Sequence, residues 1–349
     1  MVRADSPTAA TEGERPEPAD GGGPDANRWS AGWSAVTRWF RGLSWRRGLV
    51  LAALAVLVAL LFAFHASVPN TVGNLGSLLE TFLPWLGLAV PVLLALALWR
   101  RSASALVAVL LPVAVWLHLF GGQLTDKSSG KGDFTVLSHN VAAQNQDRTA
   151  TLKLLNGSGA QIVALEEVAG TDVPVYREGL AAAYPYHAVE GTVGLWSTYP
   201  ISEVGVVDLQ MGWTRAFRAR VDTPQGPLAV YVAHLPSVRV KFDSGFTAGQ
   251  RDRSARLLGE AIAHERLKKV VLLGDLNGTM NDRSLSPITA QMRSAQGAAG
   301  HGFGYSWPAG FPMARIDHIM SKGGLRPTDS RVLPADGSDH RAVTAEYRY

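Results

Sequence analysis

The feature that most restricts how this chain can fold is a long region, residues 48–120, that is almost free of charged side chains. It contains three apolar runs, at residues 48–66, 82–99 and 103–120, each close to the ~20 residues that cross a bilayer as an α-helix. A cleaved signal peptide fits poorly, because the polar tail before the first run is long and two more runs follow it. The sequence therefore predicts a membrane domain at residues 48–121 with three transmembrane helices.

The flanking charges predict how this domain is oriented. Residues 1–47 begin as a stretch rich in Pro, Gly, Ala, Asp and Glu and become basic and Trp-containing, which predicts a disordered basic tail. The connector at residues 68–81 carries Glu80 but no Lys or Arg, whereas the second run ends in Arg100 and Arg101. By the positive-inside rule the tail and the arginine pair lie in the cytoplasm, and three crossings place the rest of the chain outside the cell. We therefore expect a multi-pass protein of the cell membrane with an extracytoplasmic main domain.

After a polar linker, residues 122–132, the chain has the pattern of a globular domain of ordinary size, residues 133–349. Short apolar runs rich in β-branched residues predict strands, and residues 147–155 and 250–269 have helical patterns. The predicted strands are 134–137, 162–165, 204–207, 228–232, 270–273, 316–320 and 343–347. Strands outnumber helices without a strict βαβ alternation, which favours an α+β domain built on packed sheets.

One predicted strand ends in a polar pair. The stretch Val270–Asn277 has a run of apolar residues, then Gly274, then Asp275 and Asn277 at alternate positions. If the extended backbone persists, both polar side chains leave the same face of the strand end, where they can orient a water and contact a phosphoryl oxygen. The plain structural explanation is an Asx-type turn, in which Asp and Asn only bind backbone groups. On this stretch alone the turn is the preferred explanation.

Acidic, amide and imidazole side chains follow several other predicted strands. They are Asn140, Glu166, Glu167, His234, Asp317, Asp339 and His340. Each has an ordinary explanation by itself, since a lone histidine beside a strand is usually structural and a pair of glutamates is usually a solvated face. Metal-ligating or acid–base groups at so many strand ends are harder to explain by turn chemistry alone. Together these groups predict one shared site.

Hydrolysis of a phosphate ester accounts for this set. It needs a hard cation held by oxygen ligands, for which Glu167 and Asn140 are candidates. The absence of cysteine leaves only oxygen and imidazole ligands for any metal. Asp275 and His340 are the candidate groups for activating or orienting the water, and Asp317 is the candidate carboxylate partner of that imidazole.

The remaining polar groups, His234 and Asn277, can donate to phosphoryl oxygens as charge builds in the transition state. No P-loop sequence is present, so nucleotide-triphosphate binding of that kind is not indicated. No Gly-x-Ser-x-Gly elbow for acyl transfer is present either. The formal net charge of +4 neither favours nor excludes a nucleic-acid partner.

The order of these motifs resembles the endonuclease/exonuclease/phosphatase family, the DNase I-like fold of metal-dependent phosphoesterases. The matching motifs are Ser-His-Asn140-Val, Ile-Val-Ala-Leu-Glu-Glu167-Val, Gly194-Leu-Trp-Ser-Thr-Tyr-Pro-Ile, Val-Ala-His234-Leu, Gly-Asp275-Leu-Asn277, Arg-Ile-Asp317-His and Ser-Asp339-His340. Each motif is weak alone, and the whole series in order is highly specific. The resemblance implies a four-layer α/β/β/α sandwich with the active site at one edge of its two sheets, and Mg²⁺ or Mn²⁺ as cofactor.

The resemblance also implies metal ligands. Glu167 resembles the main ligand, with Asn140 beside it and Asp339 as a further contributor. Two positions depart from the family pattern: Glu166 stands where Gln is usual, and Ala142 replaces an Asp that some nuclease members carry. The first change is compatible with activity because the metal-binding carboxylate follows it, and the second argues against a repair-type nuclease.

The other implied roles belong to acid–base and phosphate-binding groups. These are Asp275 with Asn277 as the water- and phosphate-orienting pair, His340 with Asp317 as an imidazole–carboxylate dyad, and His234 as a second phosphate-contacting histidine. Glu190 is a loose match for the carboxylate partner of that second histidine.

The substrate depends on loops that vary freely among members of a fold. A domain held outside the membrane is well placed for lipid-linked phosphates or pyrophosphates of the cell envelope. The layout also resembles a membrane-anchored actinobacterial branch of the family that is associated with teicoplanin resistance. We therefore expect the bilayer and a phosphorylated lipid as partners, and the sequence leaves the oligomeric state open. The aromatic segment 305–312 lies shortly before Asp317 and is either substrate-facing surface or an ordinary packed loop.

Two other functions stay open. A surface-tethered nuclease is the first, because cations near the site could grip a nucleic-acid backbone. These cations are Arg239, Lys241, Arg251, Arg253 and Arg256. A non-catalytic sensor of a phosphorylated ligand is the second, although a decayed site would be expected to have lost some of the polar residues that this chain retains.

Overall fold

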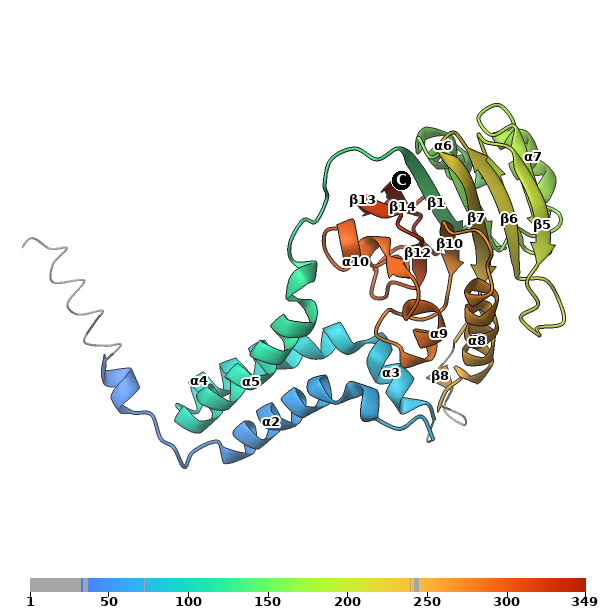
Figure 1. The fold of residues 1–349 in the computed structure, drawn as a ribbon. Helices are drawn as coiled ribbons and strands as arrows, with labels where there is room; N and C mark the ends of the chain where they lie inside the picture. The colour runs from blue at the N-terminus through green and yellow to red at the C-terminus, as the bar shows by residue number, and fades with distance from the viewer. Residues whose placement is uncertain (1–32, 34–36, 72, 239, 242–244) are drawn as a thin grey trace, which may run out of the picture.

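The computed structural model describes residues 33, 37–71, 73–238, 240–241 and 245–349 (Figure 1). Most of the predicted disordered tail therefore lies outside the described residues, as does Arg239. The domain after residue 133 contains two six-stranded sheets that pack face to face. This is the two-sheet sandwich that the motifs predict.

Each sheet has a parallel pair of strands in its middle and antiparallel strands around it. The first has the order β13 (Arg326–Val332), β14 (Val343–Arg348), β1 (Phe134–Asn140), β2 (Ile162–Glu166), β4 (Val193–Ser197) and β3 (Tyr186–Glu190). The second has the order β11 (Arg293–Ser294), β12 (Asp317–Lys322), β10 (Val270–Asp275), β7 (Gly226–His234), β6 (Ala216–Thr223) and β5 (Ile201–Val206). A separate small ribbon pairs β8 (Val240–Lys241) with β9 (Gly245–Phe246).

Helices cover the outer face of each sheet, which gives four layers (Figure 1). Leu155 of α6 and Leu180 of α7 pack on the first sheet, and Leu258 and Ile262 of α8 pack on the second. The helices of the domain are α6 (Arg148–Gly157), α7 (Val173–Leu180), α8 (Gly249–Ala263), α9 (Ser286–Thr289) and α10 (Ala295–Ala299), with the short 3-10 helix η4 (Arg283–Leu285).

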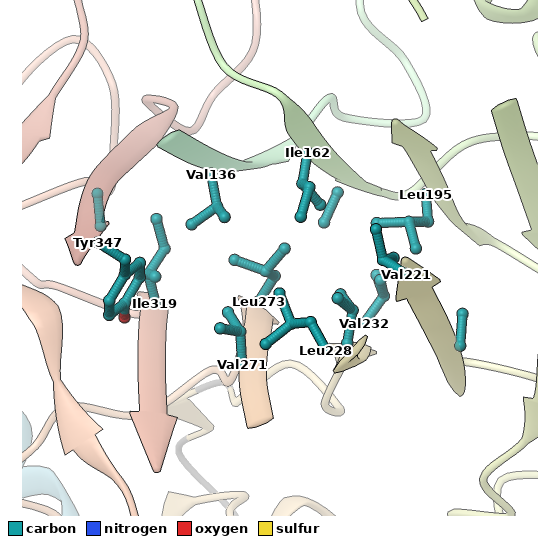
Figure 2. Close-up of a cluster of buried hydrophobic side chains, with 14 of the residues drawn as sticks. Val136, Ile162, Leu195, Val221, Leu228, Val232, Val271, Leu273, Ile319 and Tyr347 are labelled. Atoms are coloured by element: carbon teal, nitrogen blue, oxygen red, sulfur yellow. The ribbon is translucent and has the colours of Figure 1, made fainter. Parts of the chain in front are cut away.

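The central core lies between the two sheets (Figure 2). Val136 and Ile162 of the first sheet face Val232 and Leu273 of the second, and all four are fully buried. Burial of one such side chain stabilises the fold by roughly 1.5–3 kcal/mol. Since β2, β7 and β10 are covered on both faces, their sequences read as continuous apolar runs rather than as alternating ones.

All the predicted strands are present, with boundaries shifted by a few residues. The sequence did not reveal β3, β4, β6 and β13, which carry more polar or small residues, and it also missed α7. In β6 the buried and half-buried residues alternate, so the strand lacks the apolar run that marked the others. The helix predicted at residues 250–269 is shorter than expected, because α8 ends at Ala263.

The apolar N-terminal segment is helical, but it does not show three helices of membrane-spanning length. Its elements are α2 (Leu49–Ala63), η1 (His65–Ser67), α3 (Leu75–Thr81), η2 (Leu83–Leu88), α4 (Ala89–Trp99), α5 (Ala103–Phe120) and η3 (Gly121–Gln123). Among the described residues, one helix, Ala103–Gln123, is long and apolar enough to cross a membrane. Residues 75–81 and 83–99 pass the same test only as a pair bent by 71°, and Leu49–Ala63 is shorter.

The break in the second apolar run has a local cause. Pro84 lies at the start of η2, where the missing N–H of proline is tolerated but the chain cannot continue the preceding helix. The run therefore starts as a 3-10 helix and becomes α-helical only at Ala89. A helix count from composition overlooks this kind of interruption.

One contact between the helical segment and the sandwich is made by α3. The buried carboxylate of Glu80 accepts hydrogen bonds from the backbone N–H of Arg283 at 3.1 Å and from its Nε at 3.0 Å. Thr279 Oγ1 donates to the carbonyl oxygen of Glu80 at 3.3 Å, and the hydroxyl of Ser77 lies 3.5 Å from Asp282 Oδ1. The connector 68–81 and the sandwich are thus parts of one packed structure.

Candidate active site

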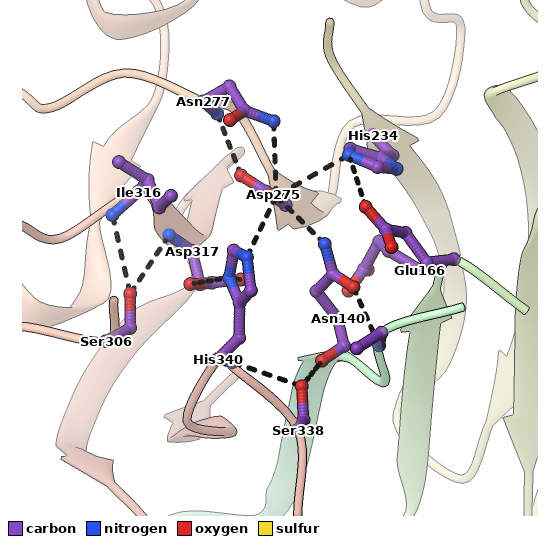
Figure 3. A network of polar contacts seen from close by, with 12 residues as sticks. Asn140, Glu166, His234, Asp275, Asn277, Ser306, Ile316, Asp317, Ser338 and His340 are labelled. Atoms are coloured by element: carbon purple, nitrogen blue, oxygen red, sulfur yellow. Dashed lines mark hydrogen bonds and ion pairs between the residues drawn. The ribbon is translucent and has the colours of Figure 1, made fainter. Parts of the chain in front are cut away.

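The predicted site residues meet at one edge of the sandwich, where central strands of both sheets end (Figure 3). In the second sheet, Asp275 at the end of β10 is in register with His234 on β7 and with Asp317 on β12. In the first sheet, Asn140 at the end of β1 is in register with Glu166 at the end of β2. The carboxyl ends of parallel strands share one edge, so strand pairing alone brings together residues that are far apart in the sequence.

Gly274 allows this register. A Cβ at this position would overlap the carbonyl oxygen of Ala233 on β7. Only glycine lets the two backbones approach so closely. The close approach seats the next residue, Asp275, beside His234 rather than one step out of register.

Asp275 is buried and held by several donors. Its Oδ1 accepts the backbone N–H of Asn277 at 2.9 Å, and its Oδ2 accepts the amides of Asn140 at 3.1 Å and Asn277 at 3.2 Å. Asn277 also donates to the carbonyl of Leu235 at 2.9 Å, so its amide positions Asp275. Burial raises the pKa of Asp275 to about 7, although the charge of His340 acts against this. A carboxyl group with such a pKa suits proton transfer near neutral pH.

His340 and Asp317 form the predicted dyad. The Nδ1 of His340 lies 3.2 and 3.0 Å from the two carboxylate oxygens of Asp317, and its Nε2 lies 3.8 Å from Asp275 Oδ2. Burial alone would lower the pKa of His340, but Asp317 and then Asp275 raise it, to about 10. Burial would raise the pKa of Asp317, and the charge of His340 lowers it instead. The imidazole is therefore a cation that donates hydrogen bonds rather than a base.

Two serines fix this dyad, and the sequence analysis did not identify them. Ser338 Oγ donates to the carbonyl of Asn140 at 2.7 Å and accepts the N–H of His340 at 3.1 Å, which ties the loop before β14 to β1. Ser306 Oγ accepts the N–H groups of Ile316 and Asp317, each at 3.4 Å. Serine two residues before a histidine is a weak signal, since such local hydroxyl contacts are common in turns.

His234 is buried and neutral. Burial and the nearby charge of Arg215 lower its pKa well below the ordinary value. Its Nε2 lies 3.6 Å from Glu167 Oε1 and 3.6 Å from Asp275 Oδ2. Its Nδ1 is buried without a hydrogen-bond partner among the described residues. The loose match of Glu190 as its carboxylate partner is therefore wrong.

The two adjacent glutamates face different surroundings. Glu167 has a left-handed backbone with φ 59°, and its partly exposed carboxylate accepts the N–H of Ala143 at 3.1 Å. Glu166 is fully buried, accepts a hydrogen bond from Ser138 Oγ at 3.0 Å, and leaves Oε2 unpaired. Burial, with Asp317 and Asp275 nearby, raises the pKa of Glu166 well above its ordinary value. A neutral carboxyl group resembles the amide of glutamine in shape and charge, which explains why Glu can occupy this position.

A pocket of about 510 Å³ opens over this edge. Its polar lining consists largely of Glu167, Asp275, Asn277, Asp339 and His340. Asp339 is exposed and lies at the pocket surface, whereas the predicted residues Asn140, His234 and Asp317 are buried and contact lining residues instead.

The apolar lining of this pocket comes from unexpected places. Trp307 and Ile316 belong to the sandwich and Phe82 to the apolar N-terminal segment, and the polar residue Thr81 beside Phe82 lines the pocket as well. The aromatic segment 305–312 thus contributes at least one side chain to the pocket. The part played by Thr81 and Phe82 had no signal in the sequence, because they lie almost 200 residues before Asp275, where the predicted connector 68–81 meets the second predicted membrane helix.

The donor set fits a hard divalent cation. Glu167, Asp275 and Asp339 present carboxylate oxygens to the pocket, and such oxygens are the preferred ligands of hard cations. Among the described residues, ligand atoms of Asp275, Asp317 and His340 lie within 4.8 Å of one another. Since His340 Nδ1 is already bonded to Asp317, we interpret that group as a dyad beside Asp275. Because Asp275 is engaged by Asn140, Asn277 and His340, we interpret Glu167 and Asp339 as the pair that would hold a cation.

The sequence profile of the Endonuclease/Exonuclease/phosphatase family matches residues 137–340, which is more than half of the chain. The chain belongs to this family. Members of the endonuclease/exonuclease/phosphatase family are hydrolases that act on phosphoester bonds. No curated protein matches the chain in sequence.

Solved structures of the family share the fold. A mannosyl-6-phosphatase from Bacteroides thetaiotaomicron is 16% identical, with a TM-score of 0.52 over 62% of this chain and 100% of the other. D. rerio TDP2, in complex with a single-strand DNA product, is 17% identical, with a TM-score of 0.52 over 62% of this chain and 99% of the other. At such low identities the likeness shows a shared fold only, and the substrate has to be inferred from the pocket.

Proposed function

We propose that this protein is a membrane-tethered, extracytoplasmic phosphoesterase that uses Mg²⁺ or Mn²⁺ to hydrolyse a lipid-linked phosphate or pyrophosphate of the cell envelope. The observation that carries the proposal is the composition of the pocket wall. Phe82 and Thr81, from the apolar segment, line the same pocket as Asp275 and Glu167. A substrate with an anionic head and an apolar chain matches a pocket with this mixture of surfaces.

The surface of the helical segment supports membrane tethering. Many of its large apolar side chains point outward and are exposed in the isolated chain. They include Leu54, Leu57, Val92, Leu98, Val107 and Leu110. Helices that are apolar on their outer faces as well as their inner ones are typical of membrane spans. Burial of these faces in lipid removes the cost of exposing them to water.

The arrangement of charges supports the predicted orientation. Arg101 lies at the end of the segment where Ser44 bonds to residues 101 and 103, and α2 and α5 both begin there. The sandwich packs against the segment through Glu80, beyond the other end of α2. Basic residues at one end and the enzyme domain at the other agree with a cytoplasmic tail and an outer sandwich.

The site residues then have separate tasks. A bound divalent cation, held by Glu167 and Asp339, would neutralise charge on the phosphoryl group. Asp275 takes the proton of the attacking water, since its pKa lies near 7. His340, kept charged by Asp317, donates a hydrogen bond to the oxygen on which negative charge grows.

The competing nuclease function loses part of its support. Arg251, one of the cations thought able to grip nucleic acid, is fully buried and bonds to Asp282 and to Asp252. Arg256 pairs with Glu260 on the exposed face of α8. These arginines are engaged within the protein, so a basic surface for a nucleic-acid backbone is weaker than the sequence suggests.

The decisive experiment uses the full chain, because the pocket includes residues of the apolar segment. In detergent or nanodiscs with Mg²⁺ or Mn²⁺, we would measure phosphate release from a polyprenyl pyrophosphate beside nicking of plasmid DNA. We expect lipid hydrolysis without nicking, and Asp275→Asn should abolish it. Nicking without lipid hydrolysis would make the protein a tethered nuclease, and inactivity on both would remove the lipid substrate from the proposal.

Matched aromatic variants test the wall of the pocket. Phe82→Ala should raise KM for the lipid substrate about tenfold, since it removes apolar contact with the chain. Phe311→Ala removes a residue that is 67% exposed and does not line the pocket, so it should leave KM unchanged. Equal KM values for Phe82→Ala and wild type would show that the segment plays no part in substrate binding.

Orientation and physiological role need tests in cells. A reporter fused after Tyr349 should be active only outside the cytoplasm, and activity inside would overturn the proposed location. A role in glycopeptide resistance belongs to the same proposal, and we expect deletion of the protein to lower teicoplanin resistance.

A further inference from the structure

A second cavity, of about 80 Å³, lies where the end of α5 meets the sandwich. Arg315 lines it, and the Nε and Nη1 atoms of this side chain are buried without a hydrogen-bond partner. Among the described residues no carboxylate lies within ion-pair distance of Arg315. Arg315 as a whole is partly exposed, but two of its guanidinium nitrogens are buried without an acceptor among the described residues, and this arrangement indicates a missing negative partner.

A second unpaired group lines the same cavity. Gln123, the last residue of the candidate span Ala103–Gln123, has its Oε1 buried without a partner. This oxygen is an acceptor and does not itself call for an anion; the amide would donate to a bound phosphate from Nε2 after a flip that exchanges the two atoms. Two unsatisfied polar side chains from different parts of the chain therefore face one small space.

An apolar hollow of about 490 Å³ adjoins this cavity. The two share Pro84, Phe303 and Tyr305 in their linings, and the hollow extends between η2, α4 and α5. Its exposed lining is almost entirely apolar. It has the size of a ligand site, since such sites span roughly 300–1,000 Å³.

The walls of the hollow are fixed in place. Trp85 stacks on Tyr305 with ring centroids 5.7 Å apart, and its Nε1 donates to the carbonyl of Met313 at 2.7 Å. Trp116 Nε1 donates to the carbonyl of Pro84 at 3.1 Å. Tryptophans with one polar contact and an apolar body are typical of the interface between a bilayer and water.

We propose that the cavity and the hollow together bind one anionic phospholipid of the bilayer, with its phosphate at Arg315 and an acyl chain in the hollow. The inference rests on the membrane placement given under the proposed function. Charge complementarity selects the occupant, because the described residues offer no acceptor to its Nε and Nη1 atoms and a guanidinium pairs well with a phosphate. Free phosphate would leave the apolar hollow unused, and a zwitterionic lipid would bring a cation beside Arg315.

This site is separate from the catalytic pocket. Thr81 is the single residue that the small cavity shares with that pocket, and the apolar hollow shares none. The lipid bound here is therefore a resident of the junction rather than the substrate. By filling the junction between the helices and the sandwich, this lipid holds Thr81 and Phe82 against the catalytic pocket.

Lipid retention measures this binding without any use of activity. The full chain is reconstituted in phosphatidylcholine nanodiscs that contain about 10% phosphatidylglycerol, extracted in mild detergent, and examined by native mass spectrometry. Wild type should retain one phosphatidylglycerol in preference to the more abundant phosphatidylcholine. Arg315→Gln should lower this retention about tenfold, since it removes charge-assisted hydrogen bonds, and Arg326→Gln, at an exposed position on β13, should not change it.

Two further measurements keep the result decisive. Val90→Phe fills the apolar hollow without altering charge and should also reduce retention. The preference of wild type for phosphatidylglycerol needs no variant, so it stands even if Arg315→Gln fails to fold. Retention of the two lipids in the proportion in which the nanodisc contains them would overturn the proposal. Displacement of phosphatidylglycerol by an equal amount of polyprenyl phosphate would also overturn it, because the site would then belong to the substrate path.

The outcome is independent of catalysis. The same retention is expected for Asp275→Asn, which lacks turnover, and without added metal. Retention of phosphatidylglycerol without hydrolysis of a lipid phosphate would support this inference and contradict the proposed function. Hydrolysis without selective retention would contradict only this inference.

Discussion

In the sandwich, central strands such as β2, β7 and β10 are buried on both faces, and each ends in a polar side chain of the site. Helices α2, α4 and α5 differ, because they expose apolar side chains on their outer faces and end without polar groups of this kind. A polar residue after an apolar run marks where an element stops. An unbroken apolar stretch indicates that the segment lies in an apolar environment. It does not show where its helices end, because those ends depend on backbone features such as proline.

The two regions meet at a short seam. Glu80 of the helical segment binds Arg283 of the sandwich, and the next residues, Thr81 and Phe82, reach the catalytic pocket. The sandwich therefore supplies the reactive groups, and the segment supplies part of the wall against which a substrate would lie. Variants in each region should affect different properties of the protein.

The largest effect is expected inside the sandwich. Asp275→Asn keeps the shape of the side chain but removes the group that would accept a proton, so turnover should fall by about 10³-fold or more. The melting temperature should fall modestly without loss of the fold, because one oxygen still accepts the N–H of Asn277 while the new NH2 faces the amide donors of Asn140 and Asn277. Steady-state rates and thermal unfolding of the full chain check both statements. A variant with the wild-type rate would show that the catalytic centre lies elsewhere.

The dyad gives a somewhat smaller effect. His340→Gln should lower kcat by about 10²–10⁴-fold, because the charged donor next to Asp275 is lost. Metal affinity, measured by titration calorimetry, should stay near the wild-type value, since the proposed ligands Glu167 and Asp339 are unchanged. A parallel loss of metal binding would instead identify His340 as a ligand.

The sequence could predict that the polar residues at the strand ends form one site, because the pairing register of the strands places these ends at one edge of the sandwich. Asn140, Glu167, His234, Asp275 and His340 could be assigned to one site for this reason. Their individual hydrogen bonds depend on tertiary packing and could not be predicted. Asn277 is an example, since its amide donates to the carbonyl of Leu235 and to Asp275, whereas a phosphate contact was expected for this residue.

The sequence said less about the seam. Glu80 stood out only as an isolated acid in an apolar region, and its partner Arg283 is about 200 residues away. Phe82 had no polar neighbour pattern that could indicate a pocket. Contacts of this kind depend on how two separately encoded regions pack, and local periodicity carries no information about that packing.

Breaking the seam should loosen the helical segment and leave the sandwich intact. Glu80→Gln removes the buried negative charge beside the partly exposed Arg283 and should lower the free energy of local opening by about 1–3 kcal/mol. Hydrogen exchange should accelerate at residues 65–82 and stay unchanged in β7 and β10. Glu178→Gln, at an exposed position on α7, is the matched control. Uniform acceleration across both regions would show that they unfold as one unit.

The smallest effect concerns acid. Burial would raise the pKa of Glu265, but hydrogen bonds from Arg218, from the N–H of Leu267 and from Tyr231 lower it to about 2. A carboxylate with a depressed folded-state pKa stabilises the protein above its unfolded-state value near 4.5 and loses that contribution as the pH falls toward 2.

The loss of stability in acid therefore has its expected origin in the sandwich rather than in the helical segment. The Glu265 carboxylate lies in the sandwich, whereas Glu80 is the single acidic residue between positions 48 and 120. Between pH 5 and pH 2, the free energy of unfolding of wild type should fall by roughly 1 kcal/mol more than that of Glu265→Gln, an amount discounted for the partly exposed Arg218. Urea unfolding followed by near-ultraviolet circular dichroism measures the difference. If the free energy of unfolding fell with pH equally in both proteins, the Glu265–Arg218 contact would contribute nothing to stability. The sensitivity to acid would then arise from other carboxylates.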